Sequence, residues 1–95
     1  MTRSELIRRL ADANPTLHQS YIADAVEVFF AEIAAGLARG DRVELRGFGS
    51  FTPRTRKARI ARNPRTGGAV EVGEKHYLGF RAGKPLLDRL NAVPD

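Results

Sequence analysis

The basic residues of this chain are concentrated in one segment. No acidic residue occurs from position 45 to position 70, and outside that segment acidic residues outnumber basic ones, so the formal net charge of +5 originates there. Guanidinium groups bind phosphate through a forked set of donors, and a positive cluster attracts polyanions. The pattern indicates a nucleic-acid partner and, less readily, an anionic membrane. The seven basic side chains of the segment are Arg46, Arg54, Arg56, Lys57, Arg59, Arg62 and Arg65.

The same segment has too few apolar residues to bury itself. Between Thr52 and Ala69 the only large aliphatic side chain is Ile60. Asn63-Pro64-Arg65-Thr66-Gly67 is strong turn chemistry, and Val70-Glu71-Val72 alternates like a returning strand. Two interpretations remain open: a disordered basic loop, or a protruding hairpin whose strands, at about ten residues each, would reach roughly 33 Å from the body.

Pro64 has two possible roles at the tip of such a hairpin. In most sequences a proline after asparagine only forms a turn. A proline is also compact, apolar and without an N–H group, so at the end of a basic arm it can enter between base pairs and kink the duplex. The residue types alone leave both roles open.

Glu44 lies between two arginines at alternate positions of one candidate strand. Arg42, Glu44 and Arg46 therefore share a strand face. One interpretation is a weak surface ion pair. The other is that Glu44 orients Arg46 toward DNA.

Two helices must precede the basic segment. Thr2 and Glu5 have the spacing of a capping box, and Asn14-Pro15 ends the first helix. A second helix begins near His18 to Ser20, without an obvious cap, and Gly40-Asp41 is a stop signal. The apolar residues recur at helical spacing on both segments, which predicts a helical hairpin.

The periodicity then changes to that of strands. Residues 42–46 alternate strictly, Gly47-Phe48-Gly49 predicts a tight turn, and Ser50-Phe51 begins a second strand. Gly79-Phe80-Arg81 is expected to rejoin this sheet. Gly83-Lys84-Pro85 opens a short last helix, because proline is tolerated in a first turn.

These elements predict a single domain over residues 1–95, with a body at 1–52 and 77–95 and an arm at about 53–76. The expected fold is α+β: an N-terminal helical hairpin, a three-stranded antiparallel sheet with a long protruding β-ribbon arm, and a short C-terminal helix. Without its arm the body is a marginal core, so we predict a dimer, although Phe30 alone could be a partly exposed aromatic. The expected dimer core is Phe29, Phe30, Ile33, Phe48, Phe51 and Phe80.

The residue types argue against an enzyme. His18 and His76 are far apart in sequence, and there is no cysteine and no carboxylate cluster to form a metal or nucleophile site. Gly47-Phe48-Gly49 is not a dinucleotide fingerprint, because Thr52 stands where that motif needs glycine. We expect no metal and no cofactor. With no secretory signal and no apolar stretch of membrane-spanning length, we expect a cytoplasmic protein without a membrane partner.

At these residues the chain resembles a known family. Residues 42–51, residues 62–67 and the Phe80-Arg81-x-Gly83-Lys84 segment resemble the bacterial HU/IHF DNA-bending family, and the resemblance covers nearly the whole chain. Glu44 and Arg46, around the Gly-Phe-Gly turn, favour the branch of integration host factor beta subunits over HU.

The resemblance implies an intertwined dimer, normally with a related alpha subunit, whose two arms wrap the minor groove of double-stranded DNA. The proline at each tip, here Pro64, would insert between base pairs. The family acts in recombination, in transcription and translation regulation, and in nucleoid organisation, which implies association with the nucleoid. The DNA-binding residues implied by the match are Arg42, Glu44, Arg46, Arg54, Arg56, Lys57, Arg59, Arg62, Asn63, Pro64, Arg65 and Lys84.

Two alternatives stay open, and the chain departs from the family pattern in three places. An HU-like homodimer would bend DNA with little sequence preference. A small RNA-binding or ribosomal protein is less favoured, because residues 52–76 lack the aromatics that stack on unpaired bases. Ile60-Ala61 replaces the Thr-Gly that often precedes Arg-Asn-Pro, Leu78-Gly79 lacks the proline common before the Phe of the last strand, and Pro85 is unusual after Gly-Lys. These departures concern the curvature of the arm and the start of the last helix.

Overall fold

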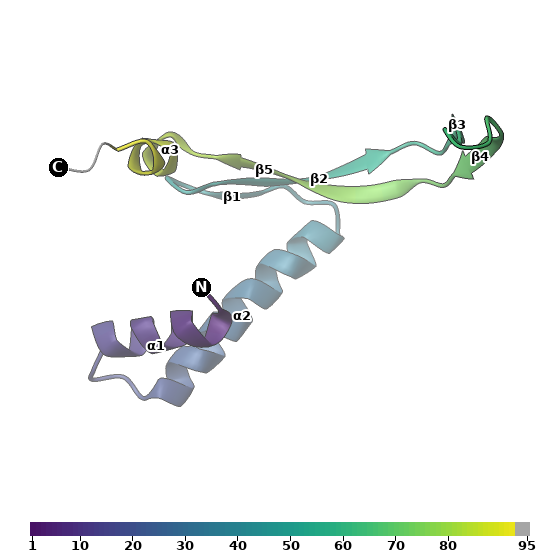
Figure 1. Cartoon of the computed structure of the whole chain (residues 1–95). Coiled ribbons are helices and arrows are strands. Elements are labelled where there is room, and N and C mark those ends of the chain that lie inside the picture. Colours follow the sequence, from purple (N-terminus) through teal and green to yellow (C-terminus); the bar gives the residue numbers. More distant parts are fainter. Residues whose placement is uncertain (93–95) are drawn as a thin grey trace. The chain divides into compact units, whose positions relative to one another are not determined.

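The computed structural model describes residues 1–92 and divides the chain into two compact units, Met1–Ala35 and Gly36–Asp95. The predicted α+β fold is confirmed: a helical hairpin is followed by antiparallel strands, a ribbon arm and a short helix (Figure 1). In chain order the elements are α1 (Arg3–Ala13), α2 (Gln19–Ala38), β1 (Val43–Leu45), β2 (Gly49–Arg56), β3 (Arg59–Arg62), β4 (Ala69–Val72), β5 (Lys75–Ala82) and α3 (Lys84–Leu90).

Helix α1 begins and ends where its sequence signals predict. The Thr2 hydroxyl accepts a hydrogen bond from the backbone N–H of Glu5 at 3.2 Å, which satisfies one of the free donors of the first turn. After Ala13 the Asn14 side-chain amide donates to the Leu10 carbonyl at 2.8 Å. Pro15 disfavours helical backbone at the residue before it, so the helix stops there.

Helix α2 is capped by a residue that the sequence did not single out. His18 Nδ1 accepts the backbone N–H of Ser20 at 3.3 Å and lies 2.8 Å from the Ser20 hydroxyl. At the other end Gly40 has φ +91° and the Asp41 N–H donates back to the Gly36 carbonyl at 3.0 Å. This is a Schellman stop, which requires a left-handed residue and therefore favours glycine. The predicted stop at Gly40-Asp41 is confirmed.

The helical unit has a thin core. Within residues 1–92 the buried hydrophobic side chains are Ile22 and Val26, at 6% and 8% exposure. The rings of Phe29 and Phe30 meet edge to face, with centroids 5.5 Å apart, and both remain about half exposed. They border an apolar groove of about 370 Å³ between α1 and α2. The unit thus leaves much of its apolar surface uncovered.

The second unit contains the predicted three-stranded antiparallel sheet, and its strand order is β1-β2-β5. Val43, Phe51 and Phe80 are aligned across the three strands. The rings of Phe51 and Phe80 lie 4.8 Å apart on one face, and Phe48 joins them with its ring 5.8 Å from that of Phe80. Since side chains alternate along a strand, the residues next to Val43, Phe51 and Phe80 in the chain lie on the opposite face.

The first strand is shorter than predicted. Residues 42–46 alternate in sequence, but only Val43–Leu45 pair with β2. The chain turns at once, because the Phe48 N–H donates to the Leu45 carbonyl at 2.9 Å and Gly47 takes φ +82°. This places Arg46 inside the turn instead of at the end of the strand.

Gly49 has a different role from the one that its turn motif predicts. It is the first residue of β2, is buried and has an ordinary negative φ. A Cβ atom there would lie 2.6 Å from the Phe80 ring and 2.7 Å from the Arg81 carbonyl oxygen. Glycine is required at this position for close packing, and the turn itself needs only Gly47.

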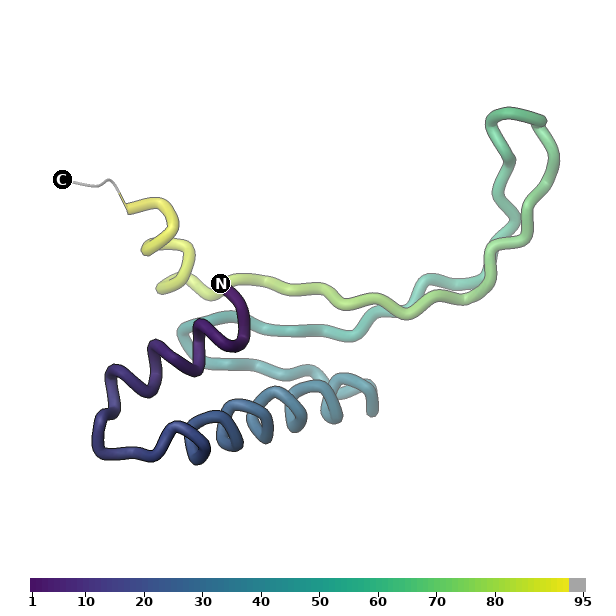
Figure 2. The backbone as a smooth tube through the Cα atoms, turned by 60° about the horizontal axis from the view of Figure 1, so that its bottom comes forward, coloured from purple at the N-terminus to yellow at the C-terminus, as the bar shows by residue number. Residues whose placement is uncertain are grey.

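The arm is built from two consecutive ladders. Strands β2 and β5 pair as far as Arg56 and Lys75, and β3 and β4 resume pairing at Arg59 and Val72 in the same register. Two residues on each strand between them are unpaired, one of which is Gly73. A glycine weakens a strand, and a two-stranded ribbon has no third strand to support it. Figure 2 shows the backbone changing direction there.

Helix α3 tolerates the unusual proline at its start. Gly83 is the N-cap and Pro85 lies in the first turn, where its missing N–H would have had no partner. The Gly83 N–H donates to the Phe48 carbonyl at 2.9 Å, which ties the start of the helix to the β1–β2 turn.

Candidate nucleic-acid interface

One face of the sheet carries a continuous row of polar and basic side chains. The register aligns Glu44, Ser50 and Arg81 across β1, β2 and β5. Further along β2, Arg54 and Arg56 lie on the same face, because residues two apart share a face. The opposite face carries the Phe51–Phe80 contact. The sheet therefore separates an apolar face from a basic one.

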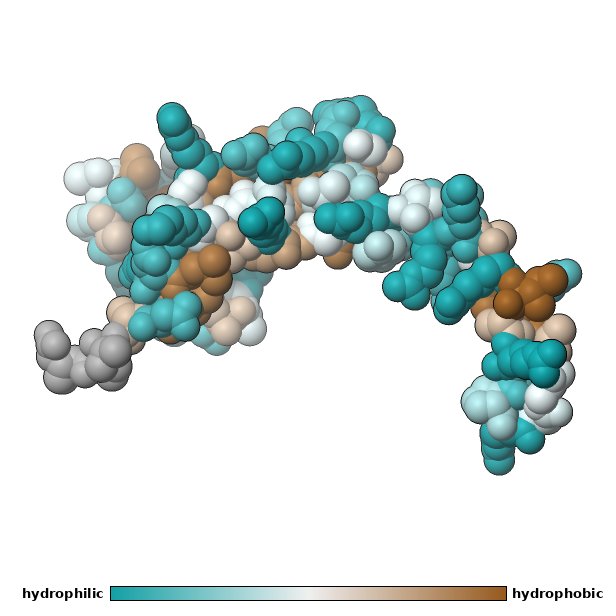
Figure 3. Space-filling model, turned by 90° about the horizontal axis from the view of Figure 1, so that it is seen from above, coloured by the Kyte–Doolittle hydropathy of each residue, from teal (hydrophilic) through white to brown (hydrophobic). Residues whose placement is uncertain are grey.

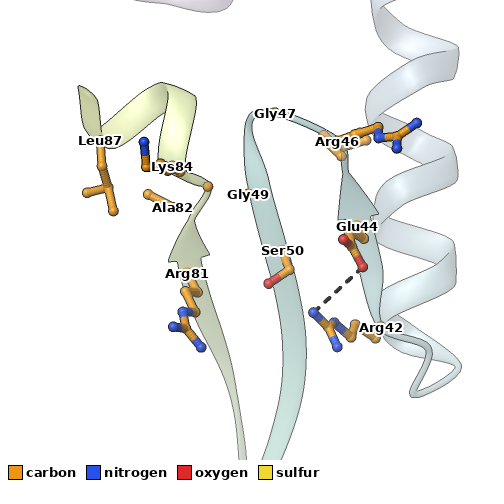
Figure 4. A pocket seen from close by; sticks show the side chains of 12 residues that line it. Arg42, Glu44, Arg46, Gly47, Gly49, Ser50, Arg81, Ala82, Lys84 and Leu87 are labelled. Atoms are coloured by element: carbon orange, nitrogen blue, oxygen red, sulfur yellow. Dashed lines mark ion pairs between the residues drawn. The ribbon is translucent and has the colours of Figure 1, made fainter. Parts of the chain in front are cut away.

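At the end of the sheet nearest α3, this basic face is hollowed into a groove of about 400 Å³ (Figure 4). Arg42 Nη2 lies 3.7 Å from Glu44 Oε2, and both side chains are more than half exposed. The Arg46 side chain points away from this pair (Figure 4). The surface ion pair predicted for Glu44 is thus present with Arg42, and its carboxylate does not hold Arg46 in this structure.

Lys84 lines the other side of the groove. Its Nζ lies 3.4 Å from Asp88 Oδ2, one helical turn along α3. The Lys84 side chain is 88% exposed, so the contact contributes little to stability and leaves the ammonium group accessible. The groove therefore collects four of the predicted DNA-binding residues: Arg42, Glu44, Arg46 and Lys84.

The groove also contains two residues that the sequence analysis did not select. Ser50 and Arg81 are paired neighbours on β2 and β5, and both line it. Arg81 lies outside the segment without acidic residues, so its charge did not stand out. The alternation from Phe80 could have found it, because the neighbour of a core residue on a strand faces the other way.

The arm is strongly basic along its length. Residues 53–76 contain seven Lys or Arg side chains and two acidic ones, Glu71 and Glu74. Glu74 lies 3.4 Å from His76 Nε2, and the same imidazole lies 3.1 Å from the Thr55 hydroxyl across the ribbon. In the view of Figure 3 the protruding ribbon is mostly hydrophilic, and its most exposed large apolar side chain is Ile60, at 74%.

The tip is a turn held by Asn63. Its backbone N–H donates to the Gly68 carbonyl at 2.9 Å, its carbonyl accepts from the Gly67 N–H at 2.7 Å, and its side-chain oxygen accepts from the Arg65 N–H at 2.9 Å. Gly67 takes φ +71°. These bonds leave Pro64 exposed at the end of the ribbon, between Arg62 and Arg65.

Ten of the twelve predicted DNA-binding residues fall into three places, and the other two, Lys57 and Arg59, lie between the base and the tip of the ribbon. Arg42, Glu44, Arg46 and Lys84 line the groove; Arg54 and Arg56 continue its face onto the ribbon; and Arg62, Asn63, Pro64 and Arg65 form the tip. Lys57 lies in the unpaired stretch between the two ladders, and Arg59 opens the second ladder.

The residues expected in a dimer core occur as two groups. Phe29, Phe30 and Ile33 belong to α2 in the first unit. Phe48, Phe51 and Phe80 form the aromatic cluster on the sheet of the second unit. Phe48 and Phe80 remain nearly half exposed.

Among residues 1–92 no three His, Asp or Glu side chains are grouped so as to hold a metal ion. No helix there is long and apolar enough to cross a membrane.

The fold and this surface define a small α+β protein that presents a basic β-ribbon to a polyanion. A family model described as bacterial DNA-binding protein matches residues 1–91. The chain therefore belongs to the family of bacterial DNA-binding proteins, and the resemblance noted in the sequence is confirmed at that level.

Solved structures show the same architecture. An Anabaena HU–DNA cocrystal structure is 30% identical, with a TM-score of 0.81 over 98% of this chain and 100% of that one. A mutant of transcription factor 1 in solution is 29% identical, with a TM-score of 0.64 over 98% and 93%. A single-residue mutant of HU from Thermotoga maritima, at 23% identity and a TM-score of 0.69 over 96% and 100%, supports the fold.

Proposed function

We propose that this protein is an architectural DNA-binding protein that bends double-stranded DNA. Two arms of a dimer would lie in the minor groove, and Pro64 at the tip of this chain's arm would insert between base pairs. The observation that carries the proposal is the ribbon itself: a basic hairpin that ends in an ordered turn with an exposed proline. The 30% identical HU was crystallised with DNA, which supports the choice of DNA over RNA.

The arm carries cations that could offset the cost of bending DNA. Phosphate contacts supply affinity that depends on salt but carry no sequence information. Unstacking a base step costs a few kcal/mol, which the additional contacts to a bent duplex can offset. Arg62 and Arg65 flank Pro64, so insertion of the proline would bring two cations toward the phosphates at the kink.

A dimer is supported by the uncovered apolar surface. Phe29, Phe30, Phe48 and Phe80 are each about half exposed, which is costly for a chain with so few buried side chains. A second subunit would cover these rings, in the intertwined arrangement that the family resemblance implies.

Two versions of the dimer have support. In the first, the chain is an integration host factor beta-type subunit paired with a related alpha subunit, which the Glu44 and Arg46 pattern favours. In the second, it is an HU-like homodimer with little sequence preference, which the likeness to HU favours. Recombination, regulation of transcription and translation, and nucleoid organisation would follow in the first case. Nucleoid association would follow in both.

Energy transfer between dyes at the two ends of a short duplex tests bending directly. The purified chain is titrated alone and together with a candidate alpha subunit, and the proposal expects a rise in transfer. A rise that requires the second subunit supports the integration host factor version. A rise with the chain alone supports the HU-like version. Binding without any rise would refute bending.

Two variants separate the wedge from the charge. Pro64→Ala removes no charge, so we expect less energy transfer at saturation and an unchanged dependence of affinity on salt. Arg65→Ala removes one cation beside it, so we expect a smaller salt slope and retained bending. Equal bending by Pro64→Ala and the parent protein would remove Pro64 from the wedge role.

A further inference from the structure

We propose that Tyr77 and Gly79 form a seat for two arginines of the ribbon and fix them as a preorganised pair of ligands for DNA backbone phosphates. We call these two residues of β5 the arginine seat. Arg54 and Arg56 lie opposite them on β2. The inference rests on the proposed function and adds to it how the base of the arm grips the duplex.

Gly79 provides the space for Arg54. A Cβ atom at Gly79 would lie 2.7 Å from Arg54 Nε and 3.4 Å from Arg54 Cδ, so the arginine side chain lies across the bare backbone of the neighbouring strand. Gly79 is half-buried although it stands on an exposed ribbon, because Arg54 covers it. In the register Arg54 is paired with Tyr77, and Gly79 is its diagonal neighbour.

Tyr77 provides a flat surface for Arg56. The Arg56 guanidinium carbon lies 5.6 Å from the centre of the Tyr77 ring, within the range of a cation–π contact. Arg56 is paired with Lys75, and Tyr77 is its diagonal neighbour. Both arginines therefore lean the same way along the ribbon, each onto the β5 residue diagonal to it.

The two guanidinium groups are held in place but are not neutralised. Among residues 1–92 the ion pairs involve other side chains, and neither Arg54 nor Arg56 has a carboxylate partner. Lys75 lies on the same face and adds to the positive potential. The positive potential of this cluster repels further cationic side chains and attracts phosphate groups.

Preorganisation gives this arrangement its value. A long arginine loses much side-chain freedom when it is fixed against a phosphate, and the loss on binding is smaller if the side chain is already ordered. The seat lies where the chain departs from the family pattern, at Leu78-Gly79 before the Phe of the last strand.

Gly79→Ala is the direct test, and Gly73→Ala is its matched control. At Gly79 the added methyl group meets the outer part of a flexible side chain, so Arg54 is displaced while the strand can remain paired. At Gly73, also on the arm, a Cβ atom would have nothing within 4 Å, and φ is not positive. Both variants are compared with the parent full-length protein by fluorescence titration of a labelled duplex at several salt concentrations, with thermal melting to check folding.

We expect Gly79→Ala to weaken binding at 0.1 M salt by up to about tenfold for each arm that carries it, because a displaced Arg54 must be ordered again on binding. The magnitude of the salt slope is expected to fall by no more than about 0.9 for each arm, the value for one phosphate contact. Gly73→Ala is expected to match the parent. In an Arg54→Ala background Gly79→Ala should have no further effect, because its target is gone.

Tyr77 supplies an independent readout. Tyr77→Phe keeps the ring and is expected to keep the parent affinity at 0.1 M salt, whereas Tyr77→Leu is expected to reduce it. Equal affinities of Gly79→Ala and Gly73→Ala throughout the salt titration, or an equal loss from Gly79→Ala with and without Arg54, would overturn the seat. Failure of the parent protein to bind or bend duplex DNA would instead overturn the proposed function, so the two failures are distinguishable.

Discussion

Gly49→Ala is expected to destabilise the protein because the added methyl group overpacks the sheet, although no existing interaction is removed. The position is buried at the start of β2, opposite Ala82 of β5. A methyl group there would lie 2.6 Å from Phe80 Cζ and 2.7 Å from the Arg81 carbonyl oxygen. The ring could turn, but the carbonyl belongs to a paired strand and can move only if β5 shifts.

The cost can be set by comparison with other overpacked sites. Extra methyl groups in a packed region cost about 1–3 kcal/mol, and backbone contact on one side suggests about 2 kcal/mol here. For a chain of this size that lowers Tm by about 10 °C. Thermal melts followed by circular dichroism, at one fixed protein concentration because of dimerisation, measure it. The control is Gly73→Ala, because a Cβ atom at Gly73 would have no heavy atom within 4 Å. A Tm for Gly49→Ala within a degree or two of the control would refute the packing argument. The role of Gly49 would then be the one in the turn that the Gly-Phe-Gly motif predicts.

Two further substitutions test the N-terminal cap of helix α1 and the role of Arg46. Thr2→Ala is expected to lower the unfolding free energy by about 1 kcal/mol, because the N–H of Glu5 loses the hydroxyl that accepts it at 3.2 Å; Thr2→Ser should retain most of that energy in the same melts, and equal losses from both would exclude the cap. Arg46→Ala is expected to narrow the affinity ratio between a preferred and a random duplex by about tenfold, the lower end of the discrimination of a base contact. The ratio is measured by competition at constant salt, and an unchanged ratio would make Arg46 a simple phosphate contact.

Local signals were sufficient to locate most elements. The hydroxyl of Thr2, the stop at Gly40 and the turn at residues 63–67 each act through a bond to a neighbour within about five residues, so their meaning is contained in a short stretch of sequence. The cap of α2 was missed because His18 accepts the Ser20 N–H through an imidazole nitrogen, and histidine is not among the residues preferred at that position.

The parts of the site that depend on strand register were less accessible. Arg81 lies in the groove because β5 is aligned with β2 so that Ser50 and Arg81 are paired. The contacts of Arg54 with Gly79 and of Arg56 with Tyr77 join residues more than twenty positions apart. A shift of one residue would move every one of these side chains to the other face, and the sequence does not state the register. The single-domain boundaries and the individual DNA contacts stay predictions.

The base and the tip of the ribbon are ordered by different interactions. The base, from Gly49–Ala82 to Arg56–Lys75, continues the sheet, and its arginines are ordered by the strand beside them. The tip holds its own shape, because Asn63 uses its N–H, its carbonyl and its side-chain oxygen within the turn. Asn63 Oδ1 is therefore already engaged before DNA arrives, which makes shaping the turn its first role. A wedge must be presented by an ordered turn, since ordering it on binding would add to the cost of unstacking a base step. Two residues on each strand are unpaired between the ladders, so the tip is ordered by its own hydrogen bonds and not by the pairing of the base.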